Sequence, residues 1–519
     1  MENRETVRQG ELEIRGEVLI RYHGTAQAVT VPEAVTEVAA EAFRGCATLR
    51  RVELPAVTRI GDRAFQGCAN LEEVTLARRL KQLGRAAFAH CGSLRHIAVP
   101  CSRLGADTGR ESSAKNRETS RCAVLPRGLT ELADETFYRC GQLGTVILPE
   151  GMTRIGGRAF WQSGVTHVAL PQSLTEIGTR AFCRCDQLHR LMLPDGLTRL
   201  GEGVFAHSGL EELSLPRGLQ ALPEKAFWDC GALHSIVLPE SITAIGSYAF
   251  GGCAQLTFLR LPQGITRLED NLFWDCGALT RVILPDGLRE IGRDVFDFCE
   301  NLRQINLPAG VRTRGGSFRG CRRLADADGF VIVNGVLDSC CGSAAEVEIP
   351  QGVTAIGRRA FLDRSGLARV TVPQSVRRIE EAAFQGCTGL RTVQLADPGI
   401  ELGPWAFSGC TGLADGQGFV IVAGHLYEGP AFGCRAEVPQ GVVSVEKGAF
   451  ADRRGLEAVT LPDSVRRVED YAFRDCEALT CVTLPAGAWV GPEAFHGCPS
   501  LPVNGPQRLP IPERFEVHG

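Results

Sequence analysis

The chain has 519 residues, of which 44% are hydrophobic and 22% are charged, so it has enough apolar material for a large buried core. Its formal net charge of −4 excludes a positive field over the whole protein of the kind that attracts nucleic acid or an anionic membrane. No apolar run approaches the roughly 20 residues that a membrane-spanning helix requires. We therefore predict neither a nucleic-acid partner nor membrane insertion.

The N-terminal residues Met1–Gln9 are polar and lack the basic start, apolar stretch and small-residue cleavage site of a secretory signal. With no wall anchor in the sequence either, we expect a cytoplasmic protein. The next segment, Glu11–Leu19, has two short apolar stretches around Gly16 and is predicted to form a β-hairpin. Residues 1–31 are predicted to be a cap that shields the first sheet edge from self-pairing.

From this cap onward, a phenylalanine recurs every 22 or 23 residues through most of the chain. Fourteen of the seventeen intervals have one of these lengths, and eighteen of the 24 phenylalanines occupy this position. The recurring residues are Phe43, Phe65, Phe88, Phe137, Phe160, Phe182, Phe205, Phe227, Phe250, Phe273, Phe296, Phe318, Phe361, Phe384, Phe407, Phe450, Phe473 and Phe495. Such a period predicts a solenoid, because one short coil cannot bury its apolar side chains alone, whereas stacked coils bury them along a continuous axis.

Each repeat has two parts with different periods. The segment Leu233–Pro239 alternates apolar and variable residues, as a short strand does, and ends at a proline that cannot donate to the next ladder position. The Ile245–Gly246 pair then allows a turn where a side chain would crowd, and Phe250 is large enough to fill the centre of the coil. We predict a single parallel β-sheet on the concave side and short turns or helical segments on the convex side, in about eighteen coils.

The pattern Leu-x-x-Ile-x-Leu-Pro-x-x-Leu-x-x-Ile-Gly-x-x-Ala-Phe-x-x-Cys resembles the BspA-like, Treponema-type leucine-rich repeat. The match extends over roughly Val29–Leu501, and the coil from Leu279 to Cys299 departs from it only at Val295. The resemblance implies a leucine-rich-repeat solenoid that acts in adhesion or another protein interaction, often at the surface of bacteria.

Three segments interrupt the repeat. Residues 101–126 are polar in their middle and are predicted to form a disordered insertion. Residues 326–349 and 415–438 each contain an apolar strand, an x-Gly turn and a second strand, which predicts a β-hairpin. We expect one solenoid over residues 32–501 that carries these projections on a single axis, followed by a tail or cap at residues 502–519.

Fourteen of the 21 cysteines lie three residues after the recurring phenylalanine. Free cysteine packs as a small apolar group, so we predict a buried ladder of reduced thiols. In the remaining coils we expect the same position to be filled by Ser163, Ser208, Ser365 and Arg454. Cys101 and Cys122 flank the polar insertion and offer an alternative, a disulfide that would require an oxidising compartment.

The sequence contains none of the motifs on which common catalytic and cofactor sites depend. A Gly-x-Ser-x-Gly elbow, a phosphate-binding loop, a Gly-x-Gly-x-x-Gly turn and a His-Glu-x-x-His helix are all missing. Cys183 and Cys185 lie near His189 but lack the Cys-x-x-Cys pairs of a zinc site. We therefore predict no catalytic residues, no metal and no cofactor.

The outward positions of each strand are free to vary, because packing constrains only the inward leucines and the proline. In the middle coils these positions combine apolar groups with arginines, a mixture typical of protein-binding hot spots. The candidate binding residues on the concave face are His189, Arg190, Met192, Glu212, Val237, Phe258, Arg260, Arg281, Ile283 and Gln304. The alternative interpretation is an ordinary solvated surface, on which single exposed apolar residues are common.

The leading hypothesis is a non-enzymatic scaffold that binds a protein of unknown identity through this face. The alternative is a structural repeat protein without a dedicated ligand, which self-associates through strand edges, hairpins or thiols. An enzyme is the third alternative and would need a deep pocket with converging ionisable groups.

Overall fold

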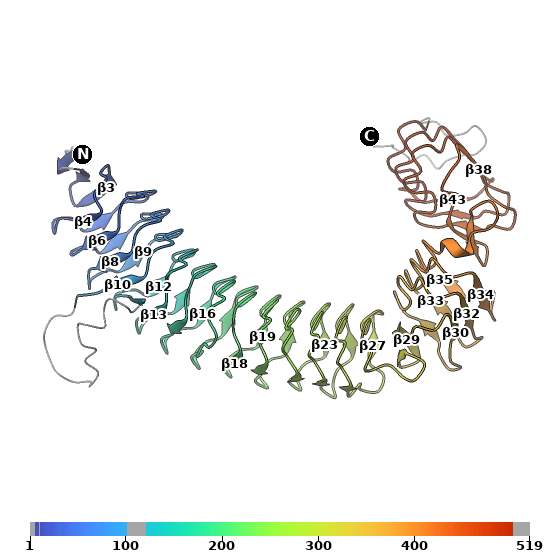
Figure 1. The fold of residues 1–519 in the computed structure, drawn as a ribbon, viewed down its shortest axis with the longest axis horizontal. Helices are drawn as coiled ribbons and strands as arrows, with labels where there is room; N and C mark the ends of the chain where they lie inside the picture. Colours follow the sequence, from blue (N-terminus) through green and yellow to red (C-terminus); the bar gives the residue numbers. More distant parts are fainter. Residues whose placement is uncertain (1–5, 10, 101–120, 502–519) are drawn as a thin grey trace. The chain divides into compact units, whose positions relative to one another are not determined.

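The structure is a computed structural model that describes residues 6–9, 11–100 and 121–501. Within these residues the fold consists of short strands and turns, and the only helix is the 3-10 helix η2 at Thr411–Leu413. The chain divides into two units, residues 1–311 (unit 1) and residues 312–519 (unit 2), and each is a stack of coils (Figure 1). No helix in the described part has the length and apolarity needed to cross a bilayer.

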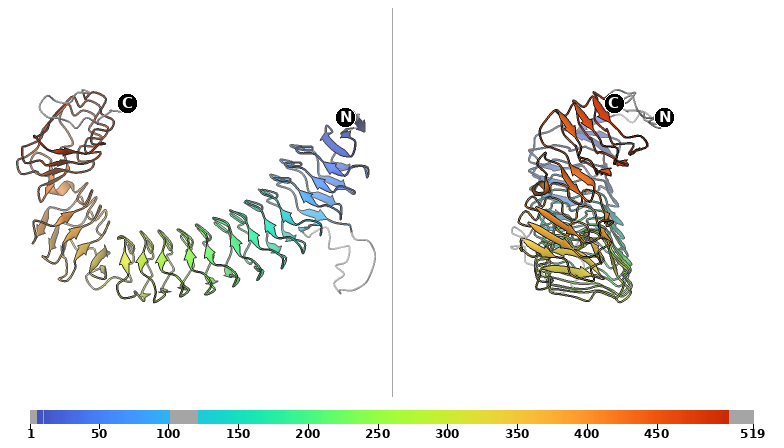
Figure 2. Two further views of the ribbon diagram at one scale, coloured as in Figure 1. Left: turned by 180° about the vertical axis from the view of Figure 1, so that it is seen from behind. Right: turned by 90° about the vertical axis from the view of Figure 1, so that its right-hand side faces the viewer.

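Most coils of unit 1 contribute short strands to two parallel ladders, which Figure 2 shows from two further sides. The strands of the first ladder are β4 (Ala28–Thr30), β6 (Arg51–Leu54), β8 (Glu73–Leu76), β10 (His96–Ala98), β11 (Cys122–Val124), β13 (Thr145–Ile147), β15 (His167–Ala169), β18 (Glu212–Ser214), β20 (Ser235–Val237), β22 (Phe258–Arg260), β24 (Arg281–Ile283) and β26 (Gln304–Ile305). The strands of the second ladder are β5 (Glu37–Val38), β7 (Arg59–Ile60), β9 (Gln82–Leu83), β12 (Glu131–Leu132), β14 (Arg154–Ile155), β16 (Glu176–Ile177), β17 (Arg199–Leu200), β19 (Ala221–Leu222), β21 (Ala244–Ile245), β23 (Arg267–Leu268) and β25 (Glu290–Ile291).

Unit 2 repeats the same two ladders. Its first ladder comprises β30 (Glu346–Glu348), β32 (Arg369–Val372), β34 (Thr392–Leu395), β38 (Arg435–Glu437), β40 (Ala458–Thr460) and β42 (Cys481–Thr483). Its two-residue strands are β27 (Arg312–Thr313), β31 (Ala355–Ile356), β33 (Arg378–Ile379), β35 (Glu401–Leu402), β39 (Ser444–Val445), β41 (Arg467–Val468) and β43 (Trp489–Val490). The repeat pattern predicts a single sheet, and the second ladder differs from that prediction. It arises because the segment before the Ile-Gly turn is extended for two residues and pairs with its neighbours.

Three antiparallel hairpins open stretches of the second ladder. They are β2 (Leu12–Arg15) with β3 (Val18–Tyr22), β28 (Phe330–Val333) with β29 (Val336–Cys340), and β36 (Val420–Val422) with β37 (His425–Glu428). In the first hairpin, β1 (Thr6–Gln9) also pairs with β2. The second strand of each hairpin runs parallel to the two-residue strand of the next coil, so a hairpin replaces a coil at the start of each stretch.

The hairpin β36–β37 is apolar on both faces. Val422 and Tyr427 pack against the core of the coils before it, whereas Phe419 and Leu426 pack against the core of the coils after it. This hairpin therefore separates two hydrophobic cores of unit 2 and contributes side chains to both.

The recurring phenylalanines form the centre of each stack. Neighbouring rings lie nearly parallel, with centroids 4.8 Å apart for Phe43 and Phe65, 5.9 Å for Phe88 and Phe137, and 4.6 Å for Phe361 and Phe384. The recurring rings are buried, as predicted, except that of Phe495, which is half-buried. The spacing is close to the distance of roughly 4.8 Å between paired strands, so the aromatic column and the ladders advance together from coil to coil.

The positions two residues before and two residues after the phenylalanine adopt left-handed backbone conformations in every coil but that of Phe495, where only Gly497 does. Around Phe182 these are Arg180 and Arg184, with φ of 55° and 59°. A non-glycine residue in this conformation costs about 1–2 kcal/mol. Hydrogen bonds between coils offset the cost, for example from the Arg184 N–H to the Ala206 carbonyl at 2.9 Å. Because many residue types fill these positions, the sequence analysis did not detect them.

The glycine of the Ile-Gly turn is required by close packing. A Cβ added to Gly84 would lie 2.5 Å from the backbone nitrogen of Asp62. The second ladder of unit 1 is interrupted before β12, β19 and β23. In these three coils the glycine is replaced by Ala133, Pro223 and Glu269. The replacement alone does not break the pairing, since Glu380 and Glu469 fill the same position in continuous ladders of unit 2.

The buried cysteine ladder is confirmed. Thirteen of its fourteen cysteines are buried, and Cys46 is half-buried. Most of these thiols donate to a phenylalanine carbonyl of the preceding coil, as Cys140 does from Sγ to the Phe88 carbonyl at 3.1 Å. Burial raises the pKa of Cys140 to about 12, so this thiol stays protonated and keeps its donor.

The predictions that Ser365 and Arg454 fill the cysteine position were wrong by one residue. The N–H groups that donate to the Phe361 and Phe450 carbonyls belong to Arg364 and Arg453, not to Ser365 and Arg454. Both arginines lie in the first coil after a hairpin and reach back to it. Arg364 donates to Cys340 Sγ and the Ala344 carbonyl, each at 2.8 Å. Arg453 donates to Glu428 Oε1 at 3.1 Å and to the Gly429 carbonyl at 3.2 Å.

The predicted insertion at residues 101–126 ends earlier than expected. Strand β11 pairs in parallel with β10 and β13, so residues 122–124 belong to the first ladder. The reason is the repeat pattern itself, since Ala123 points inward and is fully buried. Residues 101–120, including Cys101, and the predicted tail at 502–519 lie outside the described residues.

Candidate functional site

The first ladder of unit 1 presents two outward rows of side chains, because residues alternate across a strand. In β20, for example, Ile236 points inward and is 7% exposed, whereas Ser235 and Val237 point outward. We call the first residues of these strands row A and the third residues row B. Parallel pairing aligns the rows, so that Val124 neighbours Ile147, and Phe258 neighbours Arg281.

The structure places the ten predicted binding residues on this outward surface. Nine are exposed, and Ile283 is half-buried. Row A contains Arg190, Glu212, Phe258, Arg281 and Gln304, and row B contains Met192, Val237, Arg260 and Ile283. His189 precedes Arg190 at the edge of the face. The structure therefore brings these residues together on consecutive coils.

Row B also contains two exposed residues that the sequence analysis missed. Val124 is 37% exposed and Ile147 is 41% exposed, and they continue the line that Met192, at 84%, and Val237, at 62%, form in later coils. We call these four residues the aliphatic row. The signal was available, since Cys122–Pro126 has the strand pattern of the repeat, but it was assigned to the insertion.

The first ladder is interrupted twice within this face. Residues 190–192 do not pair with β15, and their only pairing is an isolated bridge between Arg190 and Glu212. The strands β20 and β22 also belong to different sheets. Met192, Val237 and Phe258 lie beside these interruptions. The three residues are the most exposed large apolar residues of unit 1, and each lacks a hydrogen-bonded strand on one side.

Charged groups are paired at one end of the face and unpaired at the other. Arg190 lies 3.4 Å from Glu212, and His189 lies 3.5 Å from Glu211. Arg260 has only a distant partner, Glu240, at 3.9 Å. Exposed Arg281 and Arg303 have no carboxylate partner within 4.0 Å among the described residues.

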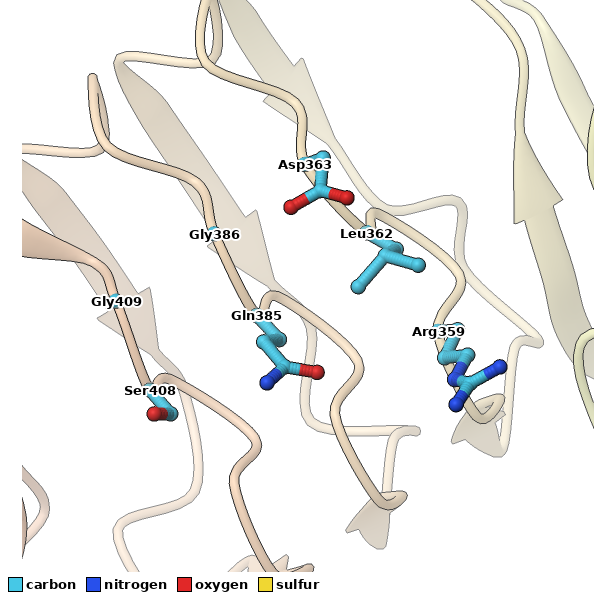
Figure 3. Close-up of a pocket in the computed structure, with 7 residues that line it drawn as sticks. All are labelled: Arg359, Leu362, Asp363, Gln385, Gly386, Ser408 and Gly409. Carbon is cyan, nitrogen blue, oxygen red and sulfur yellow. The ribbon is translucent and has the colours of Figure 1, made fainter. Parts of the chain in front are cut away.

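Unit 2 contains a shallow hollow that is not on the first ladder. It lies along the turns that follow the phenylalanines. The hollow has a volume of about 490 Å³ and is lined by residues of three successive coils. Figure 3 shows Arg359, Asp363, Gln385 and Ser408 along it. Gly386 and Gly409 line the hollow without side chains. The Asp363 carboxylate lies where a Cβ of residue 386 would be.

A second hollow, of about 560 Å³, lies in unit 1 where the second ladder is interrupted between β9 and β12. Some of its charged residues are paired, since Arg154 lies 3.3 Å from Asp134 and 3.7 Å from Glu131. Within the described residues there is no group of three or more His, Cys, Asp or Glu residues placed to hold a metal ion.

The coil pattern, the buried phenylalanine column and the parallel ladders define a leucine-rich-repeat solenoid. The family model of the BspA type leucine rich repeat region matches residues 21–106, 115–234, 220–329, 331–416 and 435–504. Because these matches cover most of the sequence, the chain belongs to this family. No curated protein matches the chain.

Several solved structures are similar to the chain. A leucine-rich repeat protein from Bacteroides ovatus is 19% identical, with 96% of this chain and 91% of that chain covered and a TM-score of 0.41. A leucine rich cell surface protein from Faecalibacterium prausnitzii is 21% identical, with 76% and 96% covered and a TM-score of 0.40. The T. pallidum leucine rich repeat protein is 24% identical, with 60% and 83% covered and a TM-score of 0.17.

Proposed function

We propose that this chain is a non-enzymatic scaffold that binds another protein through the outward face of the first ladder in unit 1, over residues 122–305. The observation that carries the proposal is the aliphatic row, in which Met192 is 84% exposed and Val237 is 62% exposed. Single exposed apolar residues need no explanation, but several in one aligned row form a surface that gains free energy when a partner covers it.

The surroundings of the aliphatic row also favour binding. Arginine and aromatic side chains are enriched where binding energy concentrates, and Phe258, Arg260 and Arg281 lie beside the row. Burial of a valine or methionine side chain contributes about 1.5–3 kcal/mol. Two such residues are therefore sufficient to change the affinity for a partner by tenfold or more.

The test begins by capturing partners on the immobilised full chain, followed by measurement of their dissociation constants. We expect the double variant Met192→Ser with Val237→Ser to lose at least tenfold in affinity, and Phe258→Ser with Arg260→Gln to lose a comparable factor. The matched control is Thr460→Ala with Thr483→Ala, which changes the same row position in unit 2. Equal partner binding by the parent chain and both unit 1 variants would contradict the proposal.

A further inference from the structure

The end of this face formed by β22, β24 and β26 differs from the rest in its charge. Phe258 and Arg281 are neighbours in row A, and Arg260 and Ile283 are neighbours in row B. The four side chains therefore form a checkerboard, in which each apolar group lies beside a guanidinium group across the strands. Phe258 is 46% exposed, so its ring is available to a partner.

Elsewhere in unit 1, arginines commonly pair with a carboxylate of an adjacent coil. Arg50 lies 3.1 Å from Glu72, and Arg180 lies 3.3 Å from Glu202. Arg281 and Arg303, like Arg217 and several other arginines of unit 1, have no carboxylate within 4.0 Å among the residues that the structure describes, so their guanidinium groups are available to a partner. Row A continues from Arg281 to Gln304, a neutral residue, so the adjacent strand does not supply the missing charge.

We propose that this end of the face binds an acidic segment of a partner protein that also carries apolar side chains. The inference rests on the proposed function and names its partner class. A guanidinium group donates two parallel hydrogen bonds to a carboxylate, which gives orientation as well as affinity. The unpaired Arg281 and Arg303 supply such donors, and Phe258 and Ile283 supply contacts for apolar side chains between the acids.

An extended segment lying across the strands fits this spacing. Arg260 in row B, Arg281 in row A and Arg303 one residue before row A belong to successive coils, so they form an oblique line across strands that are separated by about 4.8 Å when they pair. An extended peptide advances about 3.3 Å per residue, so carboxylates three residues apart span about the distance between alternate coils. A long uniform polyanion fits less well, because Glu240 lies 3.9 Å from Arg260 and would repel it.

The experiment is a selection of displayed random 12-residue peptides on the immobilised full chain, followed by affinity measurement of one enriched peptide. We expect the enriched peptides to have a net negative charge together with aliphatic or aromatic residues. Arg281→Gln with Arg303→Gln is expected to weaken binding of the enriched peptide about tenfold, and raising the salt concentration is expected to weaken it as well. The control variant Arg180→Gln with Arg199→Gln removes the same charge from the second-ladder side of unit 1 and is expected to change affinity less than twofold.

The outcomes separate this inference from the proposed function. The enriched peptides could instead be neutral or basic and still lose binding in the Met192→Ser and Val237→Ser variant. This result would contradict the acidic partner but not the binding face. Enriched peptides that are insensitive to every variant of the face would overturn both. A 12-nucleotide single-stranded DNA that binds more tightly than the acidic peptides, and loses binding in the Arg281→Gln and Arg303→Gln variant, would replace the acidic segment by a phosphate backbone.

Discussion

Unit 1 and unit 2 share the same coil but present different outer surfaces on the first ladder. In unit 1, row B carries Val124, Ile147, Met192 and Val237. In unit 2, the third residues of the corresponding strands are polar, and they are Glu348, Thr371, Gln394, Glu437, Thr460 and Thr483. Packing constrains the inward residues equally in both units, so the outward difference is not a requirement of the fold. We therefore base the proposed binding surface on a departure from the repeat rather than on the repeat itself.

The strongest test of the shared coil is removal of one ring from the phenylalanine column in each unit. Phe205 stacks at 5.9 Å and 5.4 Å from its two neighbours, and Phe384 stacks at 4.6 Å and 5.1 Å from its own. We expect Phe205→Ala and Phe384→Ala each to lower the free energy of unfolding by roughly 3–5 kcal/mol, measured by urea denaturation. A loss below about 1 kcal/mol in either unit would show that its aromatic column does not hold that unit together.

The hairpin contact of unit 2 is the next largest effect. Arg453→Cys restores the usual residue of the repeat but removes the hydrogen bonds to Glu428 and to the Gly429 carbonyl. We expect it to destabilise the protein by about 1–3 kcal/mol in urea denaturation, because the carbonyl and carboxylate lose a charged donor. Arg454→Gln, whose side chain is 73% exposed in the parent, serves as the control and is expected to stay within about 0.5 kcal/mol. If the cysteine variant were as stable as the parent, the hydrogen bonds from Arg453 to the hairpin would not stabilise the protein.

The cysteine ladder makes unit 1 sensitive to alkaline pH. Burial raises the pKa of Cys185 to about 12 and that of Cys230 to about 11, from the value of 9.0 that an exposed thiol has. Above pH 9 the unfolded chain releases these protons and the folded chain retains them, so the unfolded state is favoured as pH rises toward the folded pKa. Each thiol is expected to cost about 1.4 kcal/mol of stability per pH unit in this window.

This effect is measured by urea denaturation at pH 8 and pH 10, with Cys185→Ser and Cys230→Ser together as the comparison variant. The variant is expected to lose less stability than the parent over this range, whatever its stability at pH 8. An identical loss in the two proteins would mean that these thiols ionise in the folded chain as readily as in the unfolded one.

The smallest effect concerns the left-handed positions. Gly45 has φ of 72° and nothing within 4 Å of an added Cβ, so Gly45→Ala tests the backbone conformation without a steric clash. We expect a loss of roughly 1 kcal/mol. Gly92 also has open space around it but lies outside the left-handed region, so Gly92→Ala is expected to be neutral or slightly stabilising. Equal effects of the two substitutions in thermal denaturation would rule out the backbone as the cause.

The sequence was sufficient to predict the coil and the column at its centre. Phe250, Cys253 and their equivalents recur at fixed spacing because each must fill the same interior space in every coil, and that constraint is local to the repeat. The outward candidates, such as Met192 and Phe258, were predicted for the same reason, since an alternating strand separates inward from outward positions without reference to the rest of the chain.

Other features depended on pairing between coils. The second ladder exists because two-residue segments find partners one coil away, and the role of Arg364 and Arg453 depends on a hairpin about 24 residues earlier. The exposure of Met192 at 84% follows from the missing strand pairing beside it. Local pattern decides which way a side chain points, whereas the neighbouring coils decide what covers it and which charges are left without a partner.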